Sequence, residues 1–226
     1  MPLLIIATIV AGLWIDQSFA WGQVAVNGAA WAVLAVLWKR SAREERPALA
    51  LCLAFATAGE VFLSLAWGLY DYRLGNIPLF VPPGHVLLFW LGTRIAARLP
   101  ARSEWLVPLV SLPVVSFLAL AGRDTFGPLL FAMFVACMAI PRGRRLYATM
   151  FALSLAMEIY GTWLGNWTWR ADVPWMGLAT TNPPLAAGAF YCALDLLVLW
   201  GRATWKRSRE RRAAVPAAYL PESSGD

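Results

Sequence analysis

The chain has 226 residues, of which 60% are hydrophobic and only 14% are charged, whereas soluble domains carry about 25% charged residues. The apolar residues lie in long runs, so the composition excludes an ordinary soluble domain and predicts an all-α polytopic membrane protein. The net charge of +6 does not indicate a nucleic-acid partner, because the basic residues lie in short clusters between the apolar runs.

Eight apolar segments follow one another, and several are shorter than the roughly 20 residues that a perpendicular span needs. We expect flanking aromatic residues to complete them. Residues 1–20 end in Ser-Phe-Ala, which also fits signal-peptide cleavage, and cleavage would leave seven spans. No charged region precedes this run, so we favour a retained first helix. The segments are residues 3–20, 24–38, 48–67, 84–97, 105–121, 127–140, 146–164 and 184–201.

The basic residues indicate an orientation. Sixteen of the nineteen lysines and arginines lie after every second segment, and only Arg73, Arg123 and Arg170 lie on the other side. Because positive loops stay cytoplasmic, an even number of spans with both termini in the cytoplasm fits this split. We expect an integral protein of a bacterial inner (cytoplasmic) membrane. Residues 1–205 would form one transmembrane domain, and residues 206–226 a basic, disordered cytoplasmic tail.

The third segment carries a glutamate inside apolar sequence. Glu60 is followed by clustered aromatic residues, and the next segment starts at Pro82–Pro83. At about 1.5 Å per residue from Arg46, Glu60 lies roughly 20 Å from the cytoplasmic face, in the outer half of the hydrocarbon core. Proline suits a helix start because its missing N–H would be unpaired there anyway.

The seventh segment shows the same order. Glu158 is followed by clustered tryptophans and then by Pro183–Pro184. We therefore predict two parallel four-helix repeats, residues 1–100 and 101–205, related by an axis along the membrane normal. Glu60 and Glu158 would then face each other at equal depth.

Three intramembrane acids are candidate catalytic residues, because ionisable groups in a bilayer are costly: Glu60, Glu158 and Asp195. If the two glutamates are adjacent, one would hold a proton, and the pair could act as general acid and base. The alternative is a hydrogen bond that only holds the helices together. Asp195 lies about 10 Å closer to the cytoplasm. Aligning the two Pro-Pro starts places it opposite Arg94, so an Arg94–Asp195 ion pair is the competing interpretation.

Aromatic and polar residues after each glutamate are candidate substrate contacts. His85, in the first turn of the fourth segment, also fits a polar anchor at the outer interface, and Asn182 fits an N-cap before Pro183. The tryptophans after Glu158 are denser than an interfacial belt needs, and aromatic faces stabilise cations. The candidate substrate-binding residues are Trp67, Tyr70, Tyr72, His85, Tyr160, Trp163, Asn166, Trp167, Trp169 and Asn182.

No cofactor or metal site is indicated. The three cysteines, Cys52, Cys137 and Cys192, lie inside apolar segments without metal or disulfide spacing, and we expect them to be small buried residues. The single histidine excludes a bis-histidine haem site. The sequence has no P-loop and no GxSxG or HExxH motif.

With Glu60, Asp195 and seven or eight segments, the chain resembles the small integral-membrane terpene cyclases of meroterpenoid pathways. That family uses intramembrane acids to protonate a prenyl chain or its epoxide. The stretch YDYRLGNIPLFVPPGHVLLF also resembles membrane carotenoid cyclases and hydratases, which have a Trp/Tyr-rich exit followed by Pro-Leu or Leu-Pro. The resemblance covers residues 55–91 and 155–197. It implies that Glu60 is the family acid and that Asp195 corresponds to the second acid, although Pro82-Pro83-Gly84-His85 replaces the Pro-Glu-Glu signature of carotenoid cyclases.

We therefore expect a membrane enzyme of the lyase or isomerase type that acts on an isoprenoid lipid by acid–base chemistry. The reaction would be a protonation-initiated cyclisation, hydration or isomerisation. One alternative is a non-enzymatic lipid- or pigment-binding protein, or a subunit of a membrane complex. Another is a small transporter, since parallel repeats with midplane acids also occur there. The expected partners are a hydrophobic substrate and membrane lipids.

Overall fold

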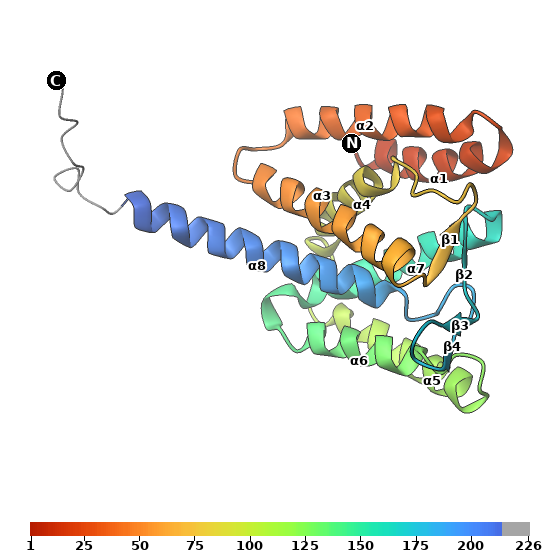
Figure 1. Ribbon diagram of the computed structural model, residues 1–226. Helices are drawn as coiled ribbons and strands as arrows, with labels where there is room; N and C mark the ends of the chain where they lie inside the picture. Colours follow the sequence, from red (N-terminus) through yellow and green to blue (C-terminus); the bar gives the residue numbers. More distant parts are fainter. Residues whose placement is uncertain (214–226) are drawn as a thin grey trace, which may run out of the picture.

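The computed structural model describes residues 1–213, with side chains to residue 210, and most of this chain is helical, as predicted. Figure 1 shows the eight α-helices of this region. Their bounds are α1 Pro2–Ser18, α2 Gly22–Arg40, α3 Arg46–Glu60, α4 Val81–Ala96, α5 Leu106–Leu120, α6 Gly127–Met138, α7 Arg144–Leu164 and α8 Gly188–Ala213. A π-helical turn, Val61–Ala66, continues α3, and short 3₁₀ turns at Ser103–Trp105 and Pro141–Gly143 precede α5 and α7.

The expectation of eight membrane spans is not supported. Within residues 1–213, two helical segments are long and apolar enough to cross a membrane, Arg46–Ala66 and Ser103–Leu120. The helices Pro2–Ser18 and Gly127–Met138 are apolar but shorter. The remaining helices do not meet both the length and the hydropathy that a span needs. Strands and turns take up part of some predicted apolar segments, and polar residues interrupt others.

The two predicted Pro-Pro helix starts differ in outcome. α4 does begin at Val81, with Pro82 and Pro83 in its first turn. α8 begins only at Gly188, so the predicted start at Pro183–Pro184 is wrong. At its other end α8 continues to Ala213, so residues 206–213 are helical and not part of a disordered tail; the rest of that predicted tail lies outside the described residues.

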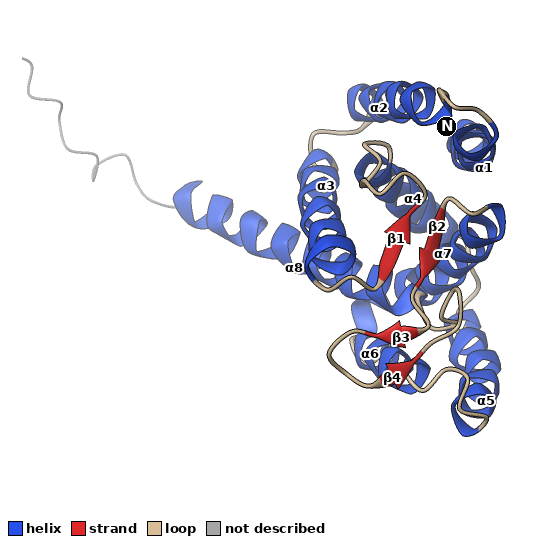
Figure 2. Cartoon of the chain, turned by 45° about the vertical axis from the view of Figure 1, so that its right-hand side comes forward, coloured by secondary structure: helices blue, strands red, loops and turns tan. Residues whose placement is uncertain are grey.

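Four helices form the centre of the molecule. α3 packs against both α4 and α8, and α7 packs against the same two helices. The α1–α2 pair lies along one side of this group and the α5–α6 pair along the other (Figures 1 and 2). Each half of the chain therefore contributes two central helices and one flanking pair.

Short strands join the two halves at one end of the helices. β1 (Tyr70–Tyr72) follows α3 and pairs antiparallel with β2 (Trp167–Trp169), which follows α7 (Figure 2). In their register Tyr70 lies opposite Trp169, and Tyr72 opposite Trp167. A second hairpin, β3 (Asp172–Val173) and β4 (Leu178–Ala179), follows directly.

Contacts around β1 and β2 are matched in the way a twofold relation between the halves requires. The backbone N–H of Arg73 donates to the carbonyl of Asn166, and that of Arg170 donates to the carbonyl of Leu69. Both helices end near a glycine with positive φ, Gly68 and Gly165, where other residues would be strained. The superposition of complete halves stays a prediction.

The first half has one residue more between its glutamate and its strand. Tyr70 lies ten positions after Glu60, while Trp167 lies nine after Glu158. The π-helical turn after Glu60 has a wider winding than an α-helix, so it absorbs an extra residue without turning the following strand away. This turn keeps the two strands in register despite their unequal spacing.

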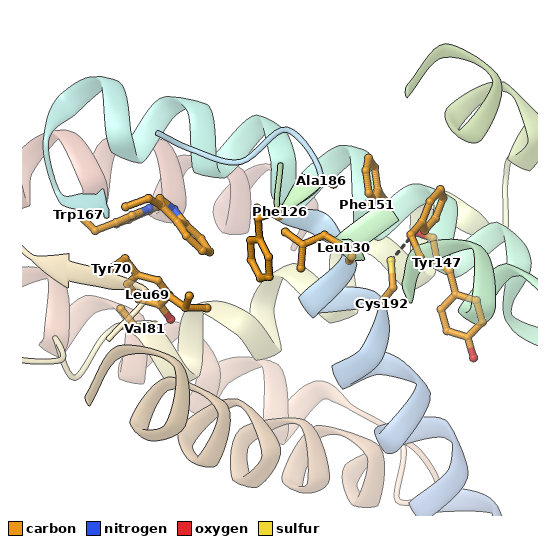
Figure 3. Close-up of a cluster of buried hydrophobic side chains, with 14 of the residues drawn as sticks. Leu69, Tyr70, Val81, Phe126, Leu130, Tyr147, Phe151, Trp167, Ala186 and Cys192 are labelled. Carbon is orange, nitrogen blue, oxygen red and sulfur yellow. Dashed lines mark hydrogen bonds between the residues drawn. The ribbon is translucent and has the colours of Figure 1, made fainter. Parts of the chain in front are cut away.

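The core runs continuously from the strands into the helices. Figure 3 shows Tyr70 and Trp167 at one end of a buried cluster that continues through Phe126 and Leu130. At the other end the thiol of Cys192 donates to the carbonyl of Tyr147. All three cysteines are buried and free, as the sequence predicts.

Gly161 on α7 supplies the space for the Trp167 ring. A Cβ at this position would collide with the indole. We expect Gly161→Ala to displace Trp167 and to lower the free energy of unfolding by about 1–3 kcal/mol, the usual cost of overpacking. Gly28→Ala on α2 is the matched control, because a Cβ there meets open space. Thermal unfolding of both purified variants checks this, and equal midpoints would contradict it.

Candidate functional site

Glu60 is buried at the end of α3 and is surrounded by side chains that can donate hydrogen bonds. The hydroxyls of Tyr70 and Tyr72 donate to its Oε2 atom at 2.8 and 2.6 Å. His85 of α4 approaches the other oxygen, with 3.6 Å between Nε2 and Oε1. Burial first, and then the charge of Glu60, raises the pKa of Tyr70 and Tyr72 well above the usual value, so both hydroxyls stay protonated as donors.

Glu158 has a matching environment on α7. The indole N–H groups of Trp167 and Trp169 donate to its Oε2 atom at 2.8 and 3.0 Å. The hydroxyl of Tyr191 on α8 donates to Oε1 at 3.1 Å. Each glutamate thus has two rings from the strand after its own helix and one ring from the helix that follows.

The local sequence explains how each strand supplies two rings. Successive residues of a strand point to opposite faces, so Tyr70 and Tyr72 share one face while Asp71 points the other way. Trp167 and Trp169 do the same around Thr168, and in both strands only the middle residue is exposed. The alternation of the sequences YDY and WTW therefore directs four rings toward the two carboxylates.

The two helix-borne rings lie against each other. His85 and Tyr191 are stacked, with ring centroids 4.8 Å apart and planes 2° apart. His85 Nδ1 lies 3.1 Å from the carbonyl oxygen of Val81, which can only accept a hydrogen bond, so this contact requires Nδ1 to carry a proton. In the neutral ring Nε2 is then unprotonated and faces Glu60. The unprotonated Nε2 atom is therefore an acceptor that faces the Glu60 carboxyl group across 3.6 Å.

Two apolar cavities adjoin this cluster. The inner cavity, about 60 Å³, lies between the cluster and the α1–α2 pair, where Ile9, Val26 and Ala30 line it. The lateral cavity, about 240 Å³, lies between α3 and α8. Among the described residues, no lysine or arginine lines either cavity. The residues that line both are Glu60, Tyr70, His85, Glu158 and Tyr191.

Several predicted substrate contacts do line these cavities. Tyr72 and Trp167 line the inner cavity, and Trp67 and Trp169 line the lateral one. His85 lines both and its side chain is only 10% exposed, so the interpretation as a polar anchor at an interface is wrong.

Other predicted contacts lie elsewhere. Trp163 is 77% exposed and does not line a cavity. The Tyr160 hydroxyl donates to the carbonyl of Val10, and the buried Asn166 amide donates to Leu13 and Asp16, so both residues attach α1 to the second half. Asn182 is not an N-cap: its side-chain oxygen accepts from the backbone N–H of Trp169, which holds β2 in place.

Asp195 is separated from the two glutamates. It is fully buried in α8 and lines neither cavity. Both carboxyl oxygens lack a hydrogen-bond partner among the described residues. The predicted Arg94–Asp195 ion pair is wrong, because Arg94 donates to Glu45 at 2.8 Å. The alignment of Pro-Pro pairs that suggested it fails because α8 starts later than α4 does.

Tyr191 is the site residue that the sequence reasoning missed. It contacts Glu158 and His85 and lines both cavities. The available signal was weak: a single hydroxyl in an apolar segment that must find a hydrogen-bond partner when buried.

The isolation of Asp195 predicts a gain in stability when its carboxyl group is removed. A buried polar group without a partner costs about 1–3 kcal/mol. We expect Asp195→Leu, which has a similar volume, to raise the free energy of unfolding by an amount of this order. Asp195→Asn serves as the control that keeps a polar group. Thermal unfolding of purified protein checks this, and a lower midpoint for Asp195→Leu would show that Asp195 has a stabilising partner.

Comparisons of the chain with protein families, with curated proteins and with solved structures found no match. The resemblance to membrane terpene cyclases and to carotenoid cyclases and hydratases therefore stays a prediction.

Proposed function

We propose that this protein is an enzyme that protonates a carbon–carbon double bond of an apolar, isoprenoid-type lipid and then guides the resulting carbocation. The observation that carries the proposal is the pair of buried carboxylates, each held by ring donors, on the wall of the same two apolar cavities. Burying two acids there is costly, and general acid–base chemistry is a use that an amide in place of the carboxyl group could not serve.

Glu60 and His85 form the acid side of the proposed reaction. A proton from this side is added to one carbon of the double bond, whose π electrons form the new C–H bond. The other carbon becomes a cation. His85 Nε2 can hold a proton while Nδ1 keeps its contact with Val81, so the pair can supply the proton without breaking other interactions.

Glu158 forms the acceptor side. Its three donors, Trp167, Trp169 and Tyr191, offset part of the cost that burial imposes on the carboxylate form. The carboxylate and the aromatic faces stabilise the cation, and Glu158 then removes a neighbouring proton to complete an isomerisation or cyclisation. In a hydration, water attacks the cation and gives up a proton instead. One proton enters the substrate and one leaves in either case.

We also propose that the protein is integral to a membrane. The outer surface carries large exposed apolar side chains, most densely on α5, where Leu109, Phe117 and Leu120 are 70%, 69% and 91% exposed. In water such a patch would be unfavourable, whereas acyl chains would cover it. The proposal extends to helices shorter than a full span, which exposed tryptophans such as Trp21 and Trp105 would anchor at the interface.

The basic loops gather at the end of the molecule away from the strands. Arg94 pairs with Glu45, which connects the loop after α2 to the end of α4. Arg145 donates to the carbonyl of Leu99, which connects the end of α4 to the start of α7. This common basic end suits the cytoplasmic face, and the strand end with the acid cluster near it suits the outer face.

A second candidate function is binding of an apolar lipid or pigment without chemistry. Each Oε2 atom already accepts two hydrogen bonds, which an amide oxygen could also accept, so the acids could be structural. The two functions differ in whether a carboxyl proton reaches the ligand.

Proton transfer predicts incorporation of solvent deuterium. Membranes that contain the protein are incubated in D₂O with acyclic isoprenoid hydrocarbons, and products are analysed by mass spectrometry. We expect deuterium at a new C–H bond, and a drop of roughly 100-fold in product for Glu60→Gln and Glu158→Gln, the scale of a lost acid or base. His85→Phe, which keeps a ring beside Tyr191, should lose activity similarly. All three variants should fold.

Asp195→Asn is the matched control, because it changes a buried carboxyl group outside the cavities. It should retain turnover within a few-fold of the unmodified protein. If both Gln variants fold and retain full turnover, the glutamates are structural and the enzyme proposal fails. If no hydrocarbon acquires deuterium while ligand still co-purifies, the binding function is favoured.

The proposed orientation predicts which engineered cysteines react from outside the cell. Ala171 lies in the exposed turn after β2, and Arg43 lies in the exposed loop before α3. Ala171→Cys should react with a membrane-impermeant maleimide on intact cells, and Arg43→Cys only after permeabilisation. The native cysteines are buried and give little background. The reverse pattern would overturn the orientation, and equal reactivity on intact cells would argue against a spanning topology.

A further inference from the structure

We propose that the ligand is one elongated, uncharged hydrocarbon chain that occupies both cavities at once, with its reactive double bond between Glu60 and Glu158. The proposal rests on the proposed function for the reaction, but its geometry stands on the cavities alone. It further assigns a short arm of the chain to the inner cavity and a long arm to the lateral cavity.

The acid cluster is the boundary between the cavities. The five residues that line both are the two glutamates, Tyr70 and the stacked rings of His85 and Tyr191. A molecule confined to one cavity would meet the cluster only with its end. A molecule that extends into both would place an internal bond beside the two carboxylates.

Beyond this boundary neither cavity offers a free polar group for a head group. The inner cavity has two further hydroxyls, of Thr8 and Tyr72, which donate to the carbonyl of Leu4 and to Glu60, and the indole N–H of Trp167, which donates to Glu158. In the lateral cavity the Trp67 indole N–H donates to Pro174, and that of Trp169 to Glu158. Because these donors are occupied, both arms must be hydrocarbon, and a phosphate or sugar head group would be left without partners.

The two cavities differ in access. The lateral cavity is lined by Phe62 and Leu197, which are 51% and 45% exposed, so it opens between α3 and α8 onto the apolar outer surface. The inner cavity is backed by Leu13, Val26 and Ala30, which are at least 95% buried. A chain would therefore enter between α3 and α8, and its leading end would stop at α1 and α2. The smaller volume of the inner cavity makes this arm the short one.

His85 is the residue that can open the boundary. Its Nε2 atom is 3.6 Å from Glu60, longer than a hydrogen bond, while its Nδ1 atom contacts only Val81. Tyr70, Tyr72 and Tyr191 all have direct hydrogen bonds to a carboxylate. Rotation of the histidine ring breaks its contact with Val81 and its stack on Tyr191 but, unlike movement of a tyrosine ring, no hydrogen bond to a carboxylate.

Two glycines allow each cavity to be filled separately. Gly59 lines the lateral cavity and Gly84 lines the inner one, and each directly precedes a residue of the cluster. A Cβ at either position meets no atom within 4 Å. Gly59→Leu and Gly84→Leu should therefore occupy cavity space without disturbing the fold. Gly28→Leu on α2, which also has open space and lines neither cavity, is the matched control.

The experiment measures retention of two hydrocarbons by purified protein, squalene as a long chain and myrcene as a short one. Each is incubated with protein, free ligand is removed, and bound ligand is quantified by mass spectrometry after solvent extraction. We expect squalene retention to fall by about tenfold or more in Gly59→Leu and in Gly84→Leu, a loss of binding free energy of about 1.4 kcal/mol. Gly28→Leu should retain as much as the unmodified protein.

Myrcene separates the two-cavity geometry from a single site. It should still bind when Gly84→Leu fills only the inner cavity, because it fits within the lateral one. If only one of the two leucine variants affects squalene, one cavity holds the whole ligand and the proposal is wrong. If neither affects it, squalene binds elsewhere, and the proposal is also wrong. Thermal unfolding of each variant must match that of Gly28→Leu for the comparison to stand.

Glu60→Gln separates this proposal from the proposed function. It should retain squalene at the unmodified level, because the amide can still accept from Tyr70 and Tyr72. Retention in both cavities without deuterium incorporation would leave the two-armed site standing and remove the enzyme. Conversely, deuterium incorporation that neither Gly59→Leu nor Gly84→Leu reduces would leave the proposed function standing and contradict the two-armed site.

Discussion

Two carboxylates can be buried in this apolar helical interior because ring donors from another part of the chain reach them. A buried ionised carboxylate without partners costs several kcal/mol, and in the described part of the chain no lysine or arginine lines the surrounding cavities. The hydroxyl and indole groups of Tyr70, Tyr72, Trp167 and Trp169 replace part of the lost hydration. The site therefore depends on short strands that lie outside the helices.

The pairing of β1 with β2 places these donors, and it does so for both glutamates together. A slip of one residue in either strand would turn its two rings to the opposite face and present Asp71 or Thr168 in their place. Contacts outside the pair oppose such a slip: Asn182 accepts from the Trp169 backbone, and the Arg170 guanidinium bonds to Asp71 across the strands. The halves of the molecule are thus joined at the same place where the acids are satisfied.

The positions of the two glutamates and the start of α4 could be predicted, because their sequence signals are local. A glutamate inside an apolar run marks a special position whatever surrounds it, so the sequence alone singles out Glu60 and Glu158. The Pro82–Pro83 pair likewise marks the start of α4. The direction in which a side chain points around its helix or strand was harder to predict. Trp163 is five residues after Glu158 on α7, which turns it about 140° away, whereas Trp167 returns on a strand.

Tertiary placement could not be predicted from either helix alone. The sequence gives Asp195 the same local character as the glutamates, an acid in an apolar segment. Only the late start of α8 and the packing of its neighbours decide that it lies away from the cavities, and that Tyr191 lies at them. The positions of residues in α8 depend on the length of the turns between Ala179 and Gly188. An alignment of the two Pro-Pro pairs does not take these turns into account.

The strands β1 and β2 present donors of different chemistry to the two glutamates, and in the proposed reaction this difference divides the roles of the acids. Tyrosine hydroxyls and an imidazole can both donate and accept, so the surroundings of Glu60 can pass a proton to it and take one away. Indole N–H groups only donate, so Trp167 and Trp169 can stabilise the Glu158 carboxylate but cannot relay its proton, and of its three donors only the Tyr191 hydroxyl can also accept. In the proposed reaction, a symmetric pair of acids would give a proton no preferred direction, whereas YDY on one strand and WTW on the other would supply a donor side and an acceptor side.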